Sequence, residues 1–508
     1  MKNYLELKSG SDVRGYASDI YENEVNLTDE AVFDITSAFV PFLSQKVGKK
    51  ANELTVSVGH DSRITAEKIK AQVIAALTKA GVSVIDCGLS STPAMFMTTV
   101  HAGCDGAVQI TASHHPADRN GLKFFLPTGG LEGDEIKKIV TDAENGVCAP
   151  EAEGSVTKRD FMTEYSAILR KLICDELGVK EEDKPLKDYH IVVDAGNGAG
   201  GFYADKVLAP LGADTSGSVY LEPDGMFPNH IPNPENALAM ASISDAVINS
   251  NADLGVIFDT DVDRAGCVDP DGVEINRNRL IALAAAIALE NEPGSTIVTD
   301  SVTSSGLKTF IENDLGGKHH RFKRGYKNVI NEAIRLCNEG TNAPLAIETS
   351  GHAALKENYF LDDGAYLVTK IIIKMAKLGK EGKNIFDLTA NLKTPKDEKE
   401  LRFNILVDDF KLYGELVIEG LERWCEAKAE EDGYIIADDN REGIRVSVDD
   451  GWFLLRLSVH DPVMPMNVES DSEGGAKKIL SKIAEFFYNC QFLDTSALRE
   501  YLEGQDEE

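Results

Sequence analysis

QITASHHP occupies residues 109–116 and directly follows a short run of strand-forming residues at 106–110. This run delivers Ser113 to a turn that two histidines and a proline close. Open α/β sheets bind their ligands beyond the carboxyl ends of strands, which is where this serine would lie. Taken alone, such a turn is typical of hydroxyl residues that bond their own backbone. A reactive serine therefore needs support from elsewhere in the chain.

A second stretch, FDTDVDR at residues 258–264, supplies that support. It places Asp259, Asp261 and Asp263 on alternate residues after the apolar run 254–258. Three carboxylates about 4 Å apart would repel one another by roughly 4 kcal/mol per pair at an effective dielectric near 20, a sum comparable with a domain's stability. A loop that holds them together therefore needs a cation, whereas a solvated acidic turn needs none.

The nature of that cation follows from the spacing. An EF-hand requires Gly at its sixth position and Glu at its twelfth, and this chain has Arg264 and Pro270 there. Three aspartates with one further oxygen ligand suit Mg²⁺, which binds carboxylate and phosphate oxygens together. A phosphate on Ser113 could provide the missing oxygen.

The pattern of the remaining chain predicts an α/β protein. Predicted strands at 54–58 and 82–85 alternate with predicted helices at 65–80 and from Thr92 to about Gly103, with Thr92 as the N-cap. This alternation indicates a parallel sheet with helices on its faces. With 508 residues, the chain exceeds the 250 to 300 residues or so that one core serves.

The rhythm changes near residue 394. A D-G turn between the apolar runs 444–448 and 452–457 predicts a β-hairpin, and a helix is expected at 475–488. The acidic end of the chain, up to Glu508, is expected to be disordered. We predict three tandem α/β domains with mixed, largely parallel sheets and a C-terminal antiparallel α+β domain, with boundaries at 1–157, 158–275, 276–393 and 394–508.

Composition excludes several classes of partner. The chain has 52 basic and 84 acidic residues, a net charge of −32, which disfavours nucleic acids and anionic membranes. Its eight cysteines form no C-x-x-C pair, so a reducing cytoplasm is expected rather than a disulfide framework. Residues 1–11 lack the apolar core of a signal peptide, and the longest apolar run, 280–289, is too short to span a bilayer.

One motif points to a different class of enzyme. Residues 196–201 read GNGAGG after a predicted strand at 189–194 and satisfy the dinucleotide-binding pattern G-x-G-x-x-G. That fold also needs an acidic residue about 20 positions later at the end of a strand, and Asp214 lies in a polar, turn-like context instead. A structural βα turn is preferred, and an NAD-dependent oxidoreductase is the less favoured alternative.

With NGLK at 120–123 and ETSGH at 348–352, the serine and aspartate stretches resemble the α-D-phosphohexomutase superfamily, closest to its phosphomannomutase/phosphoglucomutase branch. The resemblance implies four domains around one central cleft. It also implies a cytoplasmic isomerase that interconverts hexose 1-phosphate and hexose 6-phosphate, of mannose and/or glucose, through a phosphoserine and a bisphosphorylated sugar. The implied cofactors are Mg²⁺ and a hexose 1,6-bisphosphate activator. The implied partners are sugar phosphates, with no nucleic acid, membrane or obligate protein partner.

The resemblance also assigns roles to single residues. Ser113 is expected to carry the phosphate and, with the three aspartates, to bind the metal ion. Lys123 is expected to act as a general acid/base, with a pKa lowered by neighbouring cations. The remaining catalytic residues implied are Arg14, Arg264 and His352. The substrate-binding residues implied are Glu348, Ser350, Gly325, Lys327, Arg456, Ser458 and His460.

The sequence departs from the family pattern in the last domain. Residues 456–462 read RLSVHDP where the family has R-x-S-G-T-x-P, so Val459 replaces a glycine and His460 a threonine. Valine does not readily adopt a positive φ, so the phosphate cradle must differ. A smaller departure is Ile347, which stands where most members have Gly before the glutamate. A sugar-phosphate-binding paralogue without turnover is therefore a further alternative.

Overall fold

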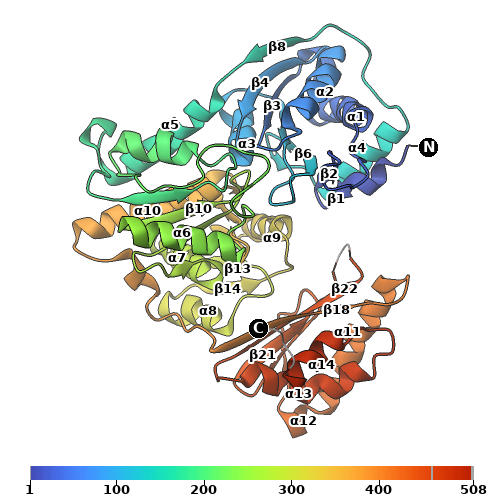
Figure 1. The fold of residues 1–508 in the computed structure, drawn as a ribbon, viewed down its shortest axis with the longest axis vertical. Coiled ribbons are helices and arrows are strands. Elements are labelled where there is room, and N and C mark those ends of the chain that lie inside the picture. Colours follow the sequence, from blue (N-terminus) through green and yellow to red (C-terminus); the bar gives the residue numbers. More distant parts are fainter. Residues whose placement is uncertain (1, 459–460, 505–508) are drawn as a thin grey trace. The chain divides into compact units, whose positions relative to one another are not determined.

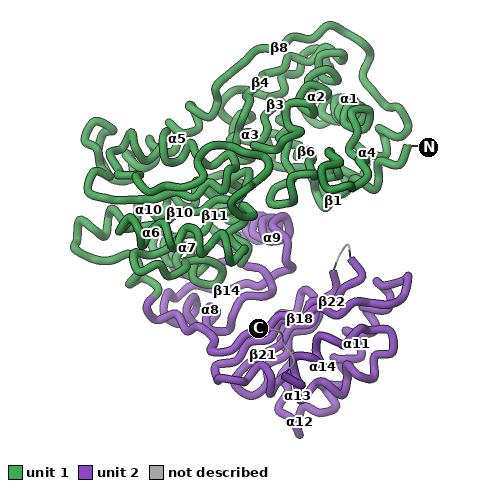
Figure 2. The backbone as a smooth tube through the Cα atoms, in the orientation of Figure 1, with its two compact units in different colours: residues 1–291, 344–389 green, residues 292–343, 390–508 purple. Residues whose placement is uncertain are grey.

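The computed structural model of the chain describes residues 2–458 and 461–504 (Figure 1). The altered positions Val459 and His460 lie outside these described residues. The chain divides into two compact units (Figure 2). Unit 1 comprises residues 1–291 and 344–389, and unit 2 comprises residues 292–343 and 390–508. The four predicted domain boundaries stay a prediction.

The first sheet of unit 1 is mixed, as predicted. Its strand order is β1-β2-β6-β5-β3-β4-β8, with β7 paired to β6. Strands β3, β4, β5 and β8 are parallel, whereas β6 runs antiparallel to β5 and to β2. The strands are β1 (Lys8–Ser9), β2 (Asp12–Tyr16), β3 (Thr55–His60), β4 (Ser83–Leu89), β5 (Gly106–Ile110), β6 (Arg119–Leu126), β7 (Gly129–Gly130) and β8 (Ser155–Lys158).

Four helices accompany this sheet: α1 (Asp29–Val47), α2 (Ala66–Lys79), α3 (Thr92–His101) and α4 (Gly133–Glu144). Helix α1 lies beside α2 and α4, whereas α3 packs against β3, β5 and β6 (Figure 1). The N-cap predicted for α3 was wrong by one residue. Ser91 caps the helix by accepting from the amide of Ala94, because the hydroxyl of Thr92 donates to Asp261 instead.

The second sheet of unit 1 has the order β12-β11-β10-β9. Strands β9 (Ile191–Asp194) and β10 (Leu254–Phe258) are parallel, and β11 (Ala265–Val268) and β12 (Glu274–Ile275) continue antiparallel. Helices α5 (Phe161–Leu177), α6 (Ala237–Ser250) and α7 (Arg277–Asn291) belong to this part of the unit. A π-helix at Tyr203–Leu208 follows the glycine-rich turn, a feature that the sequence did not predict.

Three short antiparallel strands complete unit 1: β15 (Leu345–Ile347), β16 (Ala353–Leu355) and β17 (Leu361–Asp362). The long helix α10 (Gly364–Lys380) follows them and packs against α5, α7, β11 and β16. This packing places the 348–352 segment beside the second sheet, although about 80 residues separate them in sequence.

Unit 2 contains the parallel pair β13 (Thr296–Thr299) and β14 (Lys318–Arg321), with α8 (Ser305–Thr309) and α9 (Tyr326–Asn338). It also contains the predicted antiparallel sheet, in the order β18-β22-β21-β20-β19. These strands are β18 (Asp397–Asn404), β19 (Ile435–Ile436), β20 (Ile444–Val448), β21 (Gly451–Leu455) and β22 (Val463–Ser470).

The helices of this sheet are α11 (Phe410–Ala427), α12 (Ala429–Asp432), α13 (Gly475–Tyr488) and α14 (Ser496–Glu503). Helix α13 has the predicted bounds and buries Phe487 against Phe403 of β18. The prediction of a disordered acidic end was wrong for residues 496–503, because Leu498 of α14 is buried in the same core.

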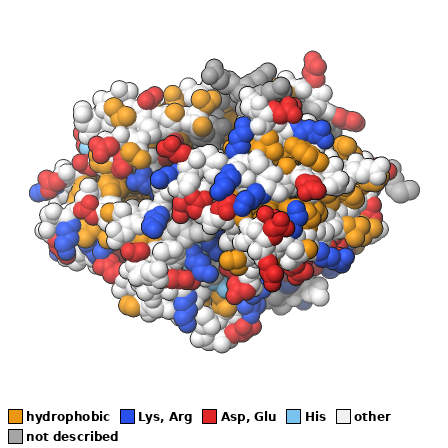
Figure 3. Space-filling model, turned by 90° about the horizontal axis from the view of Figure 1, so that it is seen from below, with side chains coloured by type: hydrophobic (Ala, Val, Ile, Leu, Met, Phe, Trp, Pro, Cys, Tyr) orange, Lys and Arg blue, Asp and Glu red, His pale blue; other side chains and the backbone are white. Residues whose placement is uncertain are grey.

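Acidic and basic side chains are interspersed on the face that Figure 3 shows, so the excess of negative charge does not form one block there. Among the described residues, no helix combines the length and the apolar character that crossing a membrane requires.

Candidate active site

Ser113 lies in unit 1, three residues beyond the fully buried strand β5. Only 1% of its surface is exposed, and its φ of 53° puts it in the left-handed region that non-glycine residues rarely occupy. The amide of Ser113 donates a 2.8 Å hydrogen bond to the hydroxyl of Thr111, which stabilises the turn. Such local strain is concentrated at functional sites.

The acidic turn meets the serine turn. Asp259, Asp261 and Asp263 are all buried, and each offers a carboxylate oxygen within 4.8 Å of the other two. The hydroxyl of Ser113 donates to Oδ2 of Asp259 at 3.2 Å, across 146 positions of sequence. Within the turn, Val262 has a φ of 68°, an outlier for a β-branched residue. The folded chain therefore brings together the two stretches that define the predicted site.

The donor set fits a hard divalent cation. Oδ1 of Asp261 and Oδ1 of Asp263 are buried and have no hydrogen-bond partner among the described residues. Burial raises the pKa of Asp259 well above its ordinary value, and the charges of Asp263 and Asp261 add to this effect. Because buried oxygens without a partner and closely spaced like charges are costly, a Mg²⁺ ion bound to these carboxylates would stabilise this arrangement.

Lys123 lies against the acidic turn from β6. Its ammonium group donates a hydrogen bond to Oδ2 of Asp263 and lies 3.5 Å from Oδ2 of Asp261. The expectation that Lys123 is buried among cations was therefore wrong, because β6 places it directly opposite two carboxylates. Burial alone would raise the pKa of Asp263, but Lys123 and Arg264 lower it below its ordinary value.

Arg264, directly after the acidic turn, connects several site residues. Its Nη2 donates to Nδ1 of His114 at 3.0 Å, and its Nε donates to Nε2 of His352 at 3.2 Å. Burial, followed by the charge of Arg264, lowers the pKa of His114 to about 2 and keeps that of His352 well below its ordinary value. Both imidazoles are therefore neutral at physiological pH.

The segment 348–352, which contains the predicted substrate-binding residues Glu348 and Ser350, joins this network. The backbone of Gly351, with a φ of 93°, approaches so closely that a Cβ there would lie 2.6 Å from the carbonyl oxygen of Ala265. Ser350 Oγ lies 2.9 Å from Nδ1 of His352 and donates to Oε2 of Glu348 at 3.3 Å. Because a guanidinium can only donate, Nδ1 of His352 carries the ring proton, and a hydrogen-bond chain runs from Arg264 to Glu348.

Arg14, on β2, also faces the site. Its Nη2 donates to Oδ2 of Asp12 at 2.7 Å. Burial and then the charge of Arg14 lower the pKa of His115 to about 3, and Arg14 acts on His114 in the same direction. The structure thus brings together all the predicted site residues of unit 1.

Asp362 is a further residue of this site that the sequence did not predict. Its Oδ2 lies 3.5 Å from Nε2 of His352, neither of its oxygens has a hydrogen-bond partner among the described residues, and burial raises its pKa well above the ordinary value. The next residue, Asp363, caps α10 by accepting from the amide of Tyr366 at 2.9 Å. In the sequence, Asp362-Asp363-Gly364 is typical of a simple turn, so the local pattern alone does not single out Asp362.

The glycine-rich turn at 196–201 has a structural explanation. A Cβ on Gly198 would lie 2.6 Å from the carbonyl oxygen of Thr260, and a Cβ on Gly201 would lie 2.3 Å from that of Leu221. Gly198 therefore lets the glycine-rich turn pack directly against the acidic turn, and Gly201 lets it pack against the backbone at Leu221. The geometry therefore favours the structural interpretation over dinucleotide binding.

Five predicted substrate-binding residues belong to unit 2, and the structure describes four of them. Gly325, with a φ of 113°, is the N-cap of α9, and Lys327 lies in the first turn of that helix. Nη1 of Arg456 lies 3.7 Å from Oε1 of Glu442, and the hydroxyl of Ser458 accepts from the amide of Asp461 at 3.2 Å. The predicted His460 lies outside the described residues.

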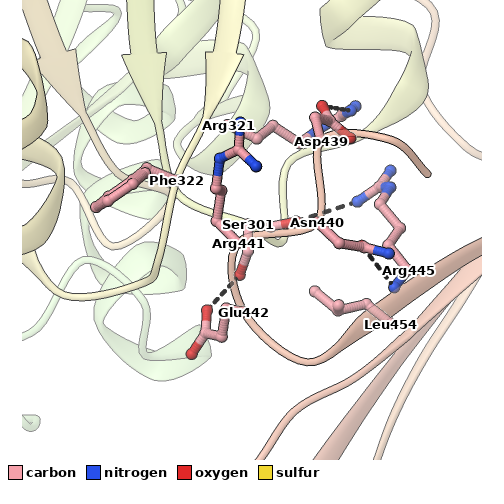
Figure 4. Close-up of a pocket in the computed structure, with 9 residues that line it drawn as sticks. All are labelled: Ser301, Arg321, Phe322, Asp439, Asn440, Arg441, Glu442, Arg445 and Leu454. Carbon is pink, nitrogen blue, oxygen red and sulfur yellow. Dashed lines mark hydrogen bonds and ion pairs between the residues drawn. The ribbon is translucent and has the colours of Figure 1, made fainter. Parts of the chain in front are cut away.

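Glu442, which the sequence did not predict as a site residue, connects these two parts of unit 2. Its Oε2 accepts from the hydroxyl of Ser301 at 2.7 Å (Figure 4) and also from the amide of Arg324 at 3.0 Å. Gly443 makes this possible, since its φ is 61° and a Cβ there would lie 2.0 Å from the carbonyl oxygen of Leu455. One carboxylate thus holds the loop before α9 next to Arg456.

Comparisons with known proteins agree with this geometry. Three family models match consecutive parts of the chain: phosphoglucomutase/phosphomannomutase α/β/α domain I at residues 7–147, domain II at 166–272 and domain III at 276–392. A phosphoglucomutase of Neisseria gonorrhoeae is 30% identical over 463 residues, which cover 90% of this chain and 92% of the relative.

A phosphomannomutase/phosphoglucomutase of Pseudomonas putida is 31% identical over 433 residues, covering 84% of this chain and 86% of that protein. The crystal structure of a phosphoglucomutase/phosphomannomutase family protein from Burkholderia thailandensis superposes with a TM-score of 0.77 at 25% identity, and covers 97% of this chain and 98% of that one.

Proposed function

The chain belongs to the phosphoglucomutase/phosphomannomutase family and is a hexose-phosphate mutase, and we propose that it works through a phosphoserine at Ser113. In this proposal it interconverts the 1-phosphate and 6-phosphate of mannose and/or glucose, with a hexose 1,6-bisphosphate as activator. The observation that carries the proposal is the 3.2 Å hydrogen bond between Ser113 and Asp259 of the acidic turn.

Each half-reaction transfers one phosphoryl group. The bond between phosphorus and Oγ of Ser113 breaks, a bond from phosphorus to a sugar hydroxyl oxygen forms, and the hydroxyl proton passes to a base of the protein. The bisphosphorylated sugar then reorients, and its other phosphate returns to Ser113. Atoms and charge balance over the cycle, so no further reactant is consumed.

The residues of unit 1 supply the positioning and charge that phosphoryl transfer needs. Asp259, Asp261 and Asp263 would hold Mg²⁺, which neutralises phosphoryl charge when bound. Arg264 and Arg14 add positive charge beside the serine.

In this proposal, His352 or Lys123 exchanges the proton with the sugar hydroxyl. Nε2 of His352 carries no proton in the neutral ring, so in this proposal it accepts one once Arg264 releases its hydrogen bond to that nitrogen. Lys123 lies on the other side of Asp263 and can exchange a proton when substrate displaces a carboxylate contact.

Substrate contacts are proposed for both units. Glu348 and Ser350 would bond the sugar hydroxyls, because their polar groups lie on one buried loop beside His352. Gly325, Lys327, Arg456, Ser458 and His460 are proposed to bind substrate from domains III (276–393) and IV (394–508), after domains I (1–157) and II (158–275). A cytoplasmic location and small sugar phosphates as the only obligatory partners complete the proposal.

The decisive experiment measures exchange between 1-phosphate and 6-phosphate for glucose, mannose and glucosamine, with Mg²⁺ and a bisphosphate activator supplied. Ser113→Ala should abolish exchange and phosphorylation, detected by intact mass and peptide mapping. Ser166→Ala is the matched control, because Ser166 is also buried but its hydroxyl donates to the carbonyl of Met162, away from the acidic turn. Stoichiometric ligand binding without exchange by the wild type would instead support the paralogue without turnover.

A further inference from the structure

Arg63 makes an unusual set of contacts with the serine loop. Its guanidinium donates to four main-chain carbonyl oxygens: that of Ser113, that of His115 at 2.6 Å, that of Pro116 at 2.7 Å and that of Arg119 at 2.9 Å. The loop from Ser113 to Arg119 therefore folds around one side chain. No part of that side chain is exposed to solvent.

The positive charge of Arg63 is balanced inside the protein. Its Nε lies 3.3 Å from Oδ2 of Asp61, whose side chain is also fully buried, and Oδ1 of Asp61 accepts from the amide of Arg63 at 3.0 Å. Burial of such a pair costs as much free energy as the attraction returns. The pair is therefore poorly explained as a source of stability, and a positional role explains it better.

The loop segment 225–227, between β9 and β10, closes over the same residue. The ring centroid of Phe227 lies 5.3 Å from Cζ of Arg63. Gly225 packs so tightly that a Cβ there would lie 2.4 Å from the amide nitrogen of Ile64 and 2.5 Å from the carbonyl oxygen of Ser62. Arg63 thus lies between the serine loop and the 225–227 segment, all within unit 1.

We propose that Arg63 is a positioning residue that holds Ser113 in its left-handed conformation, with the hydroxyl directed at Asp259. The proposal rests on the phosphoserine role of Ser113. Only arginine can bond these four carbonyl oxygens together, because the planar guanidinium presents five donors in a fixed fork. The ammonium of lysine offers three donors from one point. A reacting atom displaced by about 1 Å can cost on the order of 100-fold in rate.

The test uses Arg63→Lys, which keeps a positive charge beside Asp61, and Arg170→Lys as the matched control. Arg170 likewise pairs with a carboxylate, Glu181, and donates to a main-chain carbonyl, that of Lys206, away from the serine loop. We expect Arg63→Lys to lower kcat by about 100-fold with KM changed by less than about threefold. Arg170→Lys should change neither parameter.

Two further measurements separate positioning from folding and from the proposed function. Hydrogen exchange of peptides covering residues 111–119 should accelerate in Arg63→Lys but not in Arg170→Lys, whether or not the protein turns over substrate. Added methylguanidinium should raise the activity of Arg63→Ala by at least about tenfold, since it can occupy the space between the four carbonyl oxygens. If the wild type is inactive but the hydrogen-exchange rates differ as expected, only the proposed mutase mechanism is overturned. Three results would each overturn the role of Arg63. They are unchanged hydrogen exchange in Arg63→Lys, full turnover by that variant, and no rescue of a folded Arg63→Ala.

Discussion

Nε of Arg264 donates a hydrogen bond to Nε2 of His352 at 3.2 Å, and this contact fixes which ring nitrogen of the histidine lacks a proton. It joins the residue after the acidic turn to the last residue of the 348–352 segment, 88 positions later. Burial, followed by the charge of Arg264, keeps this imidazole neutral next to Asp263.

His352→Ala should therefore lower kcat by about 10²- to 10⁴-fold, the range for losing a general acid or base. Steady-state kinetics on the preferred hexose 1-phosphate measure this effect. His320→Ala is the control, because His320 pairs with Glu332 outside the proposed site. Equal activity of the two variants would contradict a role for His352 in proton transfer.

Asp261→Asn should uncouple stability from Mg²⁺. At a concentration 100 times its dissociation constant, a bound ion stabilises the folded state by about 2.7 kcal/mol, so Mg²⁺ should raise the Tm of the wild type. The variant loses a ligand but also one of three like charges, so its Tm without Mg²⁺ should be no lower. Calorimetry with Mg²⁺ or with a chelator measures the Tm of each protein in the two conditions. If Mg²⁺ raises the Tm of the wild type and of Asp261→Asn equally, the proposed metal site is contradicted.

The pH dependence of stability should report on His115. Its pKa falls to about 3 in the folded protein, so below about pH 6.5 the unfolded chain binds a proton that the folded chain does not. Stability is thus lost as the pH falls, by up to about 2 kcal/mol between pH 7 and pH 5. Urea unfolding of His115→Gln should show a decrease smaller by that amount, and identical decreases would contradict the shift.

Gly351→Ala should destabilise the protein more than Gly340→Ala. Both glycines have a φ near 90°, at 93° and 89°, so both substitutions carry similar backbone strain. Only at Gly351 would the new Cβ meet a neighbour, the carbonyl oxygen of Ala265 at 2.6 Å. We expect an additional loss of about 1 to 3 kcal/mol for Gly351→Ala in urea unfolding. Equal losses would show that backbone strain alone requires the glycine.

Glu442→Gln should raise KM for the sugar phosphate more than it lowers kcat. The carboxylate holds the backbone at Arg324 and lies beside Arg456, and a neutral amide weakens the attraction to the guanidinium. Glu415→Gln on α11 is an exposed control of the same chemistry. A fall in kcat with KM unchanged would indicate that Glu442 does not act through substrate binding.

The sequence predicted those helices and strands well whose bounds depend on neighbouring residues in the chain. Helix α13 and strand β5 have the expected bounds, because hydrophobic periodicity and adjacent breakers determine them. The N-cap of α3 was misplaced because the hydroxyl of Thr92 binds Asp261, 169 positions away. The π-helix after the glycine-rich turn has no sequence signature of its own.

The candidate site shows the same division. Ser113, the three aspartates and His352 stand in dense motifs, so the sequence could indicate them. Arg63 and Asp362 occur in short motifs that are typical of ordinary turns, and only the four carbonyls around Arg63 and the unpaired oxygens of Asp362 reveal them. The neighbours of Lys123 were mispredicted because cross-strand placement, not sequence distance, determines them.

The chain leaves unit 1 at residue 291 and returns to it only at residue 344. Strands β15, β16 and β17, and with them His352, are therefore synthesised after part of unit 2. At about 5 to 20 residues per second, on the order of 5 to 20 s pass on the ribosome between the completion of the first segment of unit 1 and that of the second. During this interval the nascent acidic turn lacks its histidine, so the active site can be assembled only late in translation.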